Sequence, residues 1–120
     1  MLKWSVSAGE EVMNKIRSIA ASLMLISGVT HVVQIPIYGA HGSVIGAAAF
    51  GVVYFIIGLF LFGRFRAALW AGAVLPAIGG VLGVYRFIFL HPNPFSVFHV
   101  LIDLVVVPCC IILLVCGSQE

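Results

Sequence analysis

Residues 95–116 read FSVFHVLIDLVVVPCCIILLVC, an almost wholly apolar run in which Asp103 is the single charged residue. A helix needs about 20 such residues to cross the hydrocarbon core of a bilayer. Three further runs of comparable length and character occupy residues 16–38, 44–62 and 67–85. The sequence therefore predicts four transmembrane helices that take up most of the chain.

The composition also favours a membrane protein. Hydrophobic residues make up 62% of the 120 positions and charged residues only 8%, and a soluble domain of this size cannot bury so much apolar surface in one core. The apolar runs are continuous and do not alternate with polar positions, which excludes a transmembrane β-barrel. Because the connections are short, we expect an all-α integral membrane protein in which residues 1–120 form a single antiparallel four-helix bundle.

The segment before the first span predicts a helical extension. Basic residues followed by an apolar run are typical of a secretory signal, but this run is longer than a signal core and lacks a convincing cleavage site, so we expect a retained helix. Residues 7–10 fit the capping-box pattern, which predicts that a helix starts near Ala8. Its first turns are expected to form a short juxtamembrane extension along the headgroups.

The distribution of basic residues predicts the orientation. Lys3, Lys15 and Arg17 lie at the start of the first span, and Arg64 and Arg66 lie in the second connection. The first connection has no Lys or Arg. Short segments rich in Lys and Arg remain on the cytoplasmic side. Both termini are therefore predicted to be cytoplasmic, with the first and third connections on the outer side.

With this orientation, a rise of about 1.5 Å per residue places the polar residues of the spans in the outer half of the bundle. Asp103 follows His99 by four residues and Gln34 follows His31 by three, so each pair shares one helix face. Charged groups inside a membrane usually face the bundle interior and find a partner there. The predicted polar cluster consists of His31, Gln34, Tyr38, His41, Tyr85, Arg86, His91, His99 and Asp103.

This cluster has a structural and a functional interpretation. As a clasp, Asp103 and His99 bond to His31, Gln34 or Arg86 and fix the order of the helices. As a metal site, His31, His99 and Asp103 supply imidazole and carboxylate ligands that suit zinc, copper or iron. A haem b held by His31 and His99 is a further alternative. A complete proton relay is not expected, because the inner half has no matching acid or histidine.

Other classes of function find no support in the sequence. A net charge of +2 without a basic run argues against nucleic acid as a partner. No nucleophile elbow, HExxH motif, phosphate-binding glycine loop or pair of carboxylates is present. We therefore do not expect the chain to be an enzyme by itself.

Small size and short connections favour a non-catalytic accessory or structural subunit of a larger membrane complex. Its partners in the lipid bilayer would be other membrane subunits or further copies of the chain. Small residues spaced four apart, Ala47 with Gly51 and Gly79 with Gly83, predict tight helix contacts. The alternatives are an autonomous protein that binds a metal or haem in the polar cluster, and a small oligomeric transporter or channel.

Overall fold

The computed structural model describes the backbone of residues 2–40, 42–63 and 65–116, and within these ranges the side chains from residue 9 onward. All four of its long helices have the length and composition to cross a membrane, and no strand occurs in the described part. The predicted all-α transmembrane bundle is therefore confirmed. The elements are α1 (Leu2–Tyr38), α2 (Gly42–Phe62), α3 (Arg66–Tyr85), the π-helical turn η1 (Arg86–Leu90) and α4 (Pro94–Cys116).

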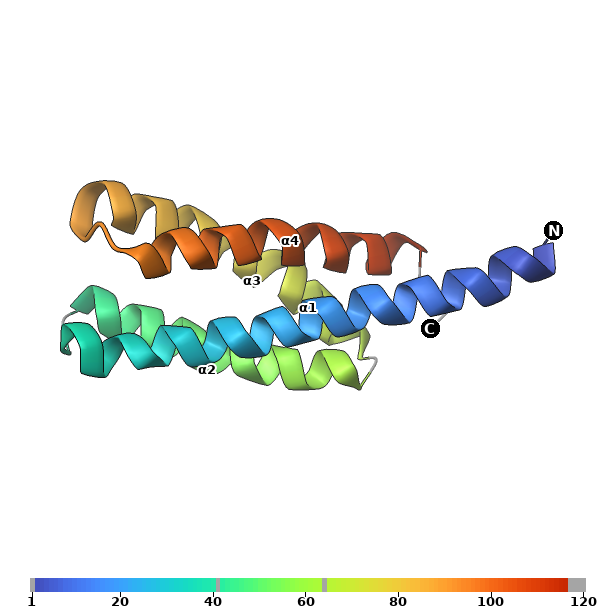
Figure 1. The fold of residues 1–120 in the computed structure, drawn as a ribbon, viewed down its shortest axis with the longest axis horizontal. Coiled ribbons are helices and arrows are strands. Elements are labelled where there is room, and N and C mark those ends of the chain that lie inside the picture. The colour runs from blue at the N-terminus through green and yellow to red at the C-terminus, as the bar shows by residue number, and fades with distance from the viewer. Residues whose placement is uncertain (1, 41, 64, 117–120) are drawn as a thin grey trace.

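The helices pack as two antiparallel pairs, α1 with α2 and α3 with α4, and α1 also packs along α4 (Figure 1). Contact between α2 and α3 is sparse, because α3 leaves the end of α2 and crosses to the side of α4 (Figure 1). The start of α1, the end of α4 and the end of α2 lie toward one end of the bundle (Figure 1). The opposite end carries the α1–α2 connection and η1, and we call it the distal end.

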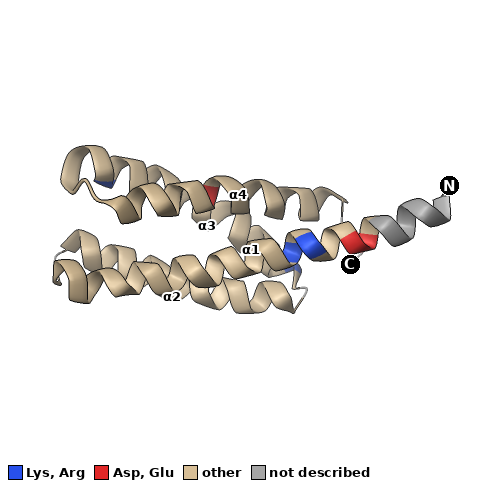
Figure 2. Ribbon diagram, in the orientation of Figure 1, with Lys and Arg blue, Asp and Glu red and all other residues tan. Residues whose placement is uncertain are grey.

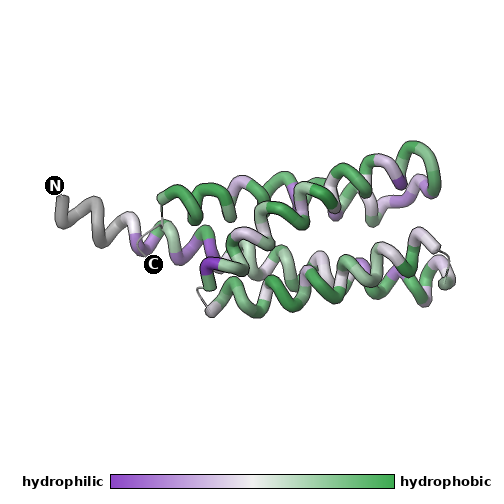
Figure 3. Tube along the Cα trace, turned by 180° about the vertical axis from the view of Figure 1, so that it is seen from behind, coloured by the Kyte–Doolittle hydropathy of each residue, from purple (hydrophilic) through white to green (hydrophobic). Residues whose placement is uncertain are grey.

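Apolar side chains cover the outside of the bundle. Val81, Phe89 and Val115 are 70%, 69% and 72% exposed. Figure 3 shows hydrophobic colours along all four helices and hydrophilic colours concentrated near the start of α1 and at the distal end. A soluble monomer rarely exposes so large a contiguous apolar surface, whereas lipid tails cover it without loss. The exposed surface thus agrees with the membrane-spanning fold.

The first helix begins earlier than the sequence predicts. α1 starts at Leu2, and residues 7–10 lie inside it, so the predicted start near Ala8 is wrong. Before Pro36 the chain has no proline. A glycine such as Gly9 inside a helix costs only about 1 kcal/mol, so no residue in this segment stops the helix. The N-terminal turns of α1 project beyond the other helices (Figure 1).

Two glycines allow α1 and α2 to approach closely. A Cβ atom added to Gly28 would lie 2.7 Å from the carbonyl oxygen of Gly51 and 2.9 Å from the Cβ of Phe55. Gly51 in turn packs against the side chain of His31. The spacing of Ala47 and Gly51 predicts close packing on this face of α2, and the structure identifies Gly28 as the partner. This contact sets the position of His31 beside α2.

Capping interactions define the two connections at the distal end. Gly39 has a φ of 86°, and its N–H donates to the carbonyl oxygen of Ile35 at 2.8 Å, which ends α1 in a left-handed cap. Before α4, the Asn93 side-chain oxygen accepts the N–H of Ser96 at 2.8 Å. Pro94 is the first residue of α4, and Asn before Pro is a favourable start for a helix. These caps fix where α1 ends and α4 begins at the distal end.

Candidate ligand-binding cavity

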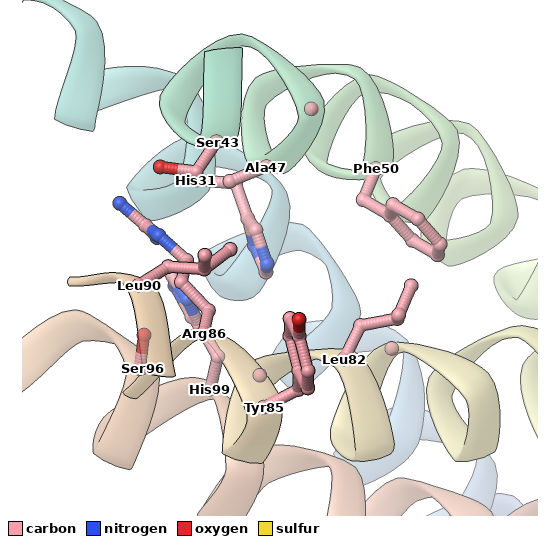
Figure 4. Close-up of a pocket in the computed structure, with 13 residues that line it drawn as sticks. His31, Ser43, Ala47, Phe50, Leu82, Tyr85, Arg86, Leu90, Ser96 and His99 are labelled. Carbon is pink, nitrogen blue, oxygen red and sulfur yellow. The ribbon is translucent and has the colours of Figure 1, made fainter. Parts of the chain in front are cut away.

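A partly open cavity of about 290 Å³ lies at the distal end, where α2 and α3 diverge (Figure 4). Its size is close to the lower limit of the roughly 300–1,000 Å³ typical of small-molecule sites. The walls are mainly apolar, and the polar groups come from α1, the first turns of α2 and α4, and η1. The lining residues are His31, Ser43, Gly46, Ala47, Phe50, Gly79, Leu82, Gly83, Tyr85, Arg86, Leu90, Ser96 and His99.

Arg86 brings a positive charge to this cavity. The residue is only 7% exposed, and its Nη1 donates to the side-chain oxygen of Gln34 at 2.7 Å. Its Nη2 lies 3.4 Å from Nδ1 of His91, and its buried Nε has no hydrogen-bond partner. Neither partner is an acid, and no carboxylate pairs with Arg86 in the described part of the chain, where the ion pair seen joins Lys15 to Glu11. The guanidinium is therefore held away from water without a counter-charge.

The π-helical turn determines where this arginine lies. The N–H of His91 donates to the carbonyl oxygen of Arg86 at 2.7 Å, which is the i to i+5 bond of a π-helix. Turns of this kind are rare and occur frequently at functional sites. Arg86 is the first residue of η1, and its hydrogen bond to Gln34 connects the end of α3 with α1.

The local electrostatics at the cavity are positive. Ser43, Gly46 and Ala47 belong to the first two turns of α2, and Ser96 belongs to the first turn of α4, so the N-terminal turns of two helices lie beside this region. A helix N-terminus carries about half a positive charge. Figure 2 shows the acidic residues of the described chain near the start of α1 and in the middle of α4, with none at the distal end.

His31 and His99 form a stacked pair at the cavity. Their ring centroids lie 3.6 Å apart with an angle of 9° between the rings. Nδ1 of His31 lies 2.6 Å from the carbonyl oxygen of Ser27, and since a carbonyl only accepts, this nitrogen carries the hydrogen. The hydroxyl of Thr30 donates to a carbonyl oxygen of its own helix and lies 2.7 Å from Nε2 of His99, which therefore donates to it. The stacked pair thus links α1 to α4.

These hydrogen bonds determine what the imidazoles can offer a ligand. Nε2 of His31 and Nδ1 of His99 retain lone pairs, and no described residue donates to either. Each can accept a hydrogen bond from a hydroxyl group. The cavity therefore combines acceptors on the two histidines with donors on Arg86, next to walls that suit an aliphatic chain.

Asp103 lies outside this cavity, one turn further along α4 than His99. It is 5% exposed, with its carboxyl group near Gly80 of α3 and within hydrogen-bonding reach of the Tyr54 hydroxyl of α2. Its Oδ1 has no hydrogen-bond partner. The structure records no bond from Asp103 to the partners proposed for the clasp, since His99 is turned toward Thr30 and His31 by its hydrogen bond and stacking. Asp103 therefore connects α4 to α2 through Tyr54.

The metal site formed by His31, His99 and Asp103 stays a prediction. Among the described residues no group of three or more His, Cys, Asp and Glu side chains is arranged to hold a metal ion. A haem b would need His31 and His99 to point at one iron from opposite sides of the porphyrin, whereas the rings lie face to face at 3.6 Å. This arrangement does not fit haem ligation. Elemental analysis of the purified chain tests the predicted metal site.

The other residues of the predicted cluster lie in different places. Tyr38 contacts the ring of His91 at a centroid distance of 4.7 Å, beside Arg86. Tyr85 lines the cavity but is half exposed, and His41 lies outside the described residues.

Four polar residues that position the cluster were not predicted from the sequence. Ser27 and Thr30 belong to the polar stripe along α1, and Asn93 belongs to the Asn-Pro start of α4, so these three could have been found from the sequence. Ser96 had no comparable signal.

No protein-family model, curated protein or solved structure matches the chain. Function is therefore inferred from the residues around the cavity.

Proposed function

We propose that the chain is a non-catalytic membrane protein that takes a small amphiphilic molecule from the bilayer and holds its polar end in the distal cavity. The observation that carries this proposal is the position of Arg86, His31 and His99 at one end of a cavity with apolar walls. A ligand with an aliphatic chain can lie between α2 and α3, which both line the cavity and make little contact with each other. Arg86, whose Nε has no partner among the described residues, can then bond to the polar end of the ligand.

Displacement of a fluorescent probe tests this proposal. The protein is placed in nanodiscs of phosphatidylcholine, a dansyl-labelled fatty acid is bound, and unlabelled fatty acid and fatty alcohol compete with it. Ala47→Phe fills the cavity with a ring, because Ala47 lines it. Ala49→Phe is the matched control, since Ala49 is exposed on the same helix and does not line the cavity.

The proposal predicts saturable binding that Ala47→Phe weakens by at least about tenfold and Ala49→Phe leaves unchanged. Such a factor corresponds to about 1.4 kcal/mol, a modest loss for a ligand excluded from its pocket. Binding that is no stronger than to empty nanodiscs, or equal loss in both variants, would reject the proposal.

An accessory subunit of a larger membrane complex is the second candidate. The observation that favours it is the exposure of α3. Only 11% of the residues in its span are buried, compared with 33–39% in the other three spans. A helix of a partner subunit could cover this side of α3. Purification from native membranes in a mild detergent tests this candidate, and a chain that migrates alone counts against it.

A small oligomeric transporter or channel stays a third prediction, which flux assays in liposomes test.

We propose further that both termini are cytoplasmic and that the cavity opens in the outer half of the membrane, as the basic residues near the termini favour. Single cysteines test the orientation in a chain whose own three cysteines are replaced by serine. An impermeant maleimide should label Ala40→Cys in intact cells and Gly63→Cys only after lysis. The reverse pattern would place the distal end in the cytoplasm.

A further inference from the structure

We infer that the ligand of the distal cavity carries an anionic head group, a carboxylate or a phosphate ester, and that Arg86 recognises it. This inference rests on the proposed function and specifies the chemical class of the ligand. The proposed function follows from polar side chains at one end of a cavity with apolar walls, and the present inference adds the charge of Arg86.

The first argument is the missing counter-charge. Arg86 is 7% exposed and lines the cavity, yet neither of its hydrogen-bond partners, Gln34 and His91, is an acid. An arginine within a membrane span usually pairs with an acid or faces a polar pathway, because an unpaired charge in apolar surroundings is costly. The acids of the described chain lie elsewhere, in the first turns of α1 and at Asp103. A ligand anion supplies the charge that the described residues leave out.

The second argument is the number of donors that remain. A guanidinium has five N–H donors in a planar fork that matches carboxylate and phosphate oxygens. Two interactions of Arg86 are recorded, and Nε is buried without a partner. A neutral alcohol or ketone offers a single oxygen, with two lone pairs and no charge. An anionic head group accepts from several donors at once and forms the stronger, charge-assisted bonds.

The third argument is the direction of the helices. The first two turns of α2 contribute Ser43, Gly46 and Ala47 to the lining, so the positive end of the α2 helix dipole lies beside the same cavity as Arg86. A cationic ligand would meet the positive end of α2 and the charge of Arg86 together. Selection against cations is therefore as much a part of the inference as preference for anions.

A series of amphiphiles with one chain and different head groups tests the inference. Laurate, lauryl phosphate, lauryl alcohol and lauryl trimethylammonium compete for the cavity of the wild-type protein in phosphatidylcholine nanodiscs. Inorganic phosphate is a fifth competitor, which separates recognition of a lipid head group from binding of a free anion. We expect at least one of the two anionic amphiphiles to bind roughly tenfold or more tightly than the alcohol, and the cation to bind most weakly.

Arg86→Gln removes the charge but keeps a polar side chain, and the expected result is loss of the preference for anions with retained binding of the alcohol. Arg86→Lys retains the charge without the planar fork and should preserve part of the preference. Because the wild-type series needs no variant, the inference stays testable if Arg86→Gln does not fold.

Two outcomes separate the inference from the function on which it rests. If the alcohol binds as tightly as both anionic amphiphiles, the anion inference is wrong and the proposed function stands. If no amphiphile binds above the level of empty nanodiscs, the proposed function itself fails. If inorganic phosphate competes as well as lauryl phosphate, the aliphatic chain of the ligand adds nothing and the cavity binds a free anion. That result would also overturn the proposal that the ligand is an amphiphile.

Discussion

The guanidinium of Arg86 donates a 2.7 Å hydrogen bond to the side-chain oxygen of Gln34, and this bond joins the π-helical turn after α3 to the interior of α1. Gln34 is fully buried, and its Nε2 has no hydrogen-bond partner. The amide is thus oriented by the charge of Arg86. This pair fixes the polar end of the cavity, and its removal has a measurable consequence.

Gln34→Met keeps the approximate shape of the side chain and removes the acceptor. The buried guanidinium then loses its shortest hydrogen bond, and we expect the free energy of unfolding to fall by about 1–3 kcal/mol. Unfolding in mixed micelles with increasing sodium dodecyl sulfate measures this change. Val33→Ala, at an exposed position of the same helix, is the control and should cost much less. Equal effects in the two variants would show that the bond to Arg86 contributes nothing.

The hydrogen bond between Thr30 and His99 is expected to couple α1 to α4. Thr30→Val and His99→Phe each remove one partner and keep the approximate volume, and the phenyl ring keeps the stacking on His31. A double-mutant cycle on the unfolding free energy should give a coupling of about 0.6 kcal/mol, with roughly 1.7 kcal/mol as the upper end for interhelical bonds in membranes. A coupling energy of zero would indicate that the contact has no energetic role.

The close approach of Gly28 and Gly51 predicts strong overpacking on substitution. Gly28→Leu forces a side chain into a space 2.7 Å from a carbonyl oxygen, so we expect α1 and α2 to separate locally, with a loss of about 1–3 kcal/mol or more. Gly46→Leu makes the same change on α2 where an added Cβ meets nothing within 4 Å. Thermal denaturation followed by circular dichroism should separate the two variants clearly. If Gly28→Leu were as stable as Gly46→Leu, the described contact would be wrong.

Asp103 and Tyr54 are predicted to behave as one unit. Tyr54→Phe removes the hydroxyl within reach of the buried carboxyl group and should destabilise the bundle by about 1–3 kcal/mol, because a buried polar group then lacks its partner. Replacement of both partners by apolar groups is often nearly neutral. The double variant Tyr54→Phe with Asp103→Leu should therefore be at least as stable as Tyr54→Phe alone. Tyr85→Phe is the control at an exposed tyrosine, and additive losses in the double variant would argue against the pair.

The four spans could be predicted from the sequence because lipid imposes a simple requirement, about 20 apolar residues in each span, which the chain repeats four times. The gathering of His31, His99 and Arg86 at one end also follows from helix rise and chain direction. Their partners could not be predicted, because the rotation of α4 against α1 and the rotamer of His99 decide whether this imidazole bonds to Thr30 of α1 or to Asp103 on its own helix. The π-helical turn at Arg86 leaves no mark in the sequence, and neither does the crossing of α3 from α2 to α4 that opens the cavity.

The most direct test of the central claim is native mass spectrometry of the protein extracted from membranes in a mild detergent without added lipid. We predict that the wild type and Ala49→Phe retain a small amphiphile at one copy per chain, released on activation, and that Ala47→Phe has lost it. A wild-type protein without any retained amphiphile, or the same amount retained by Ala47→Phe, would contradict a ligand site between α2 and α3.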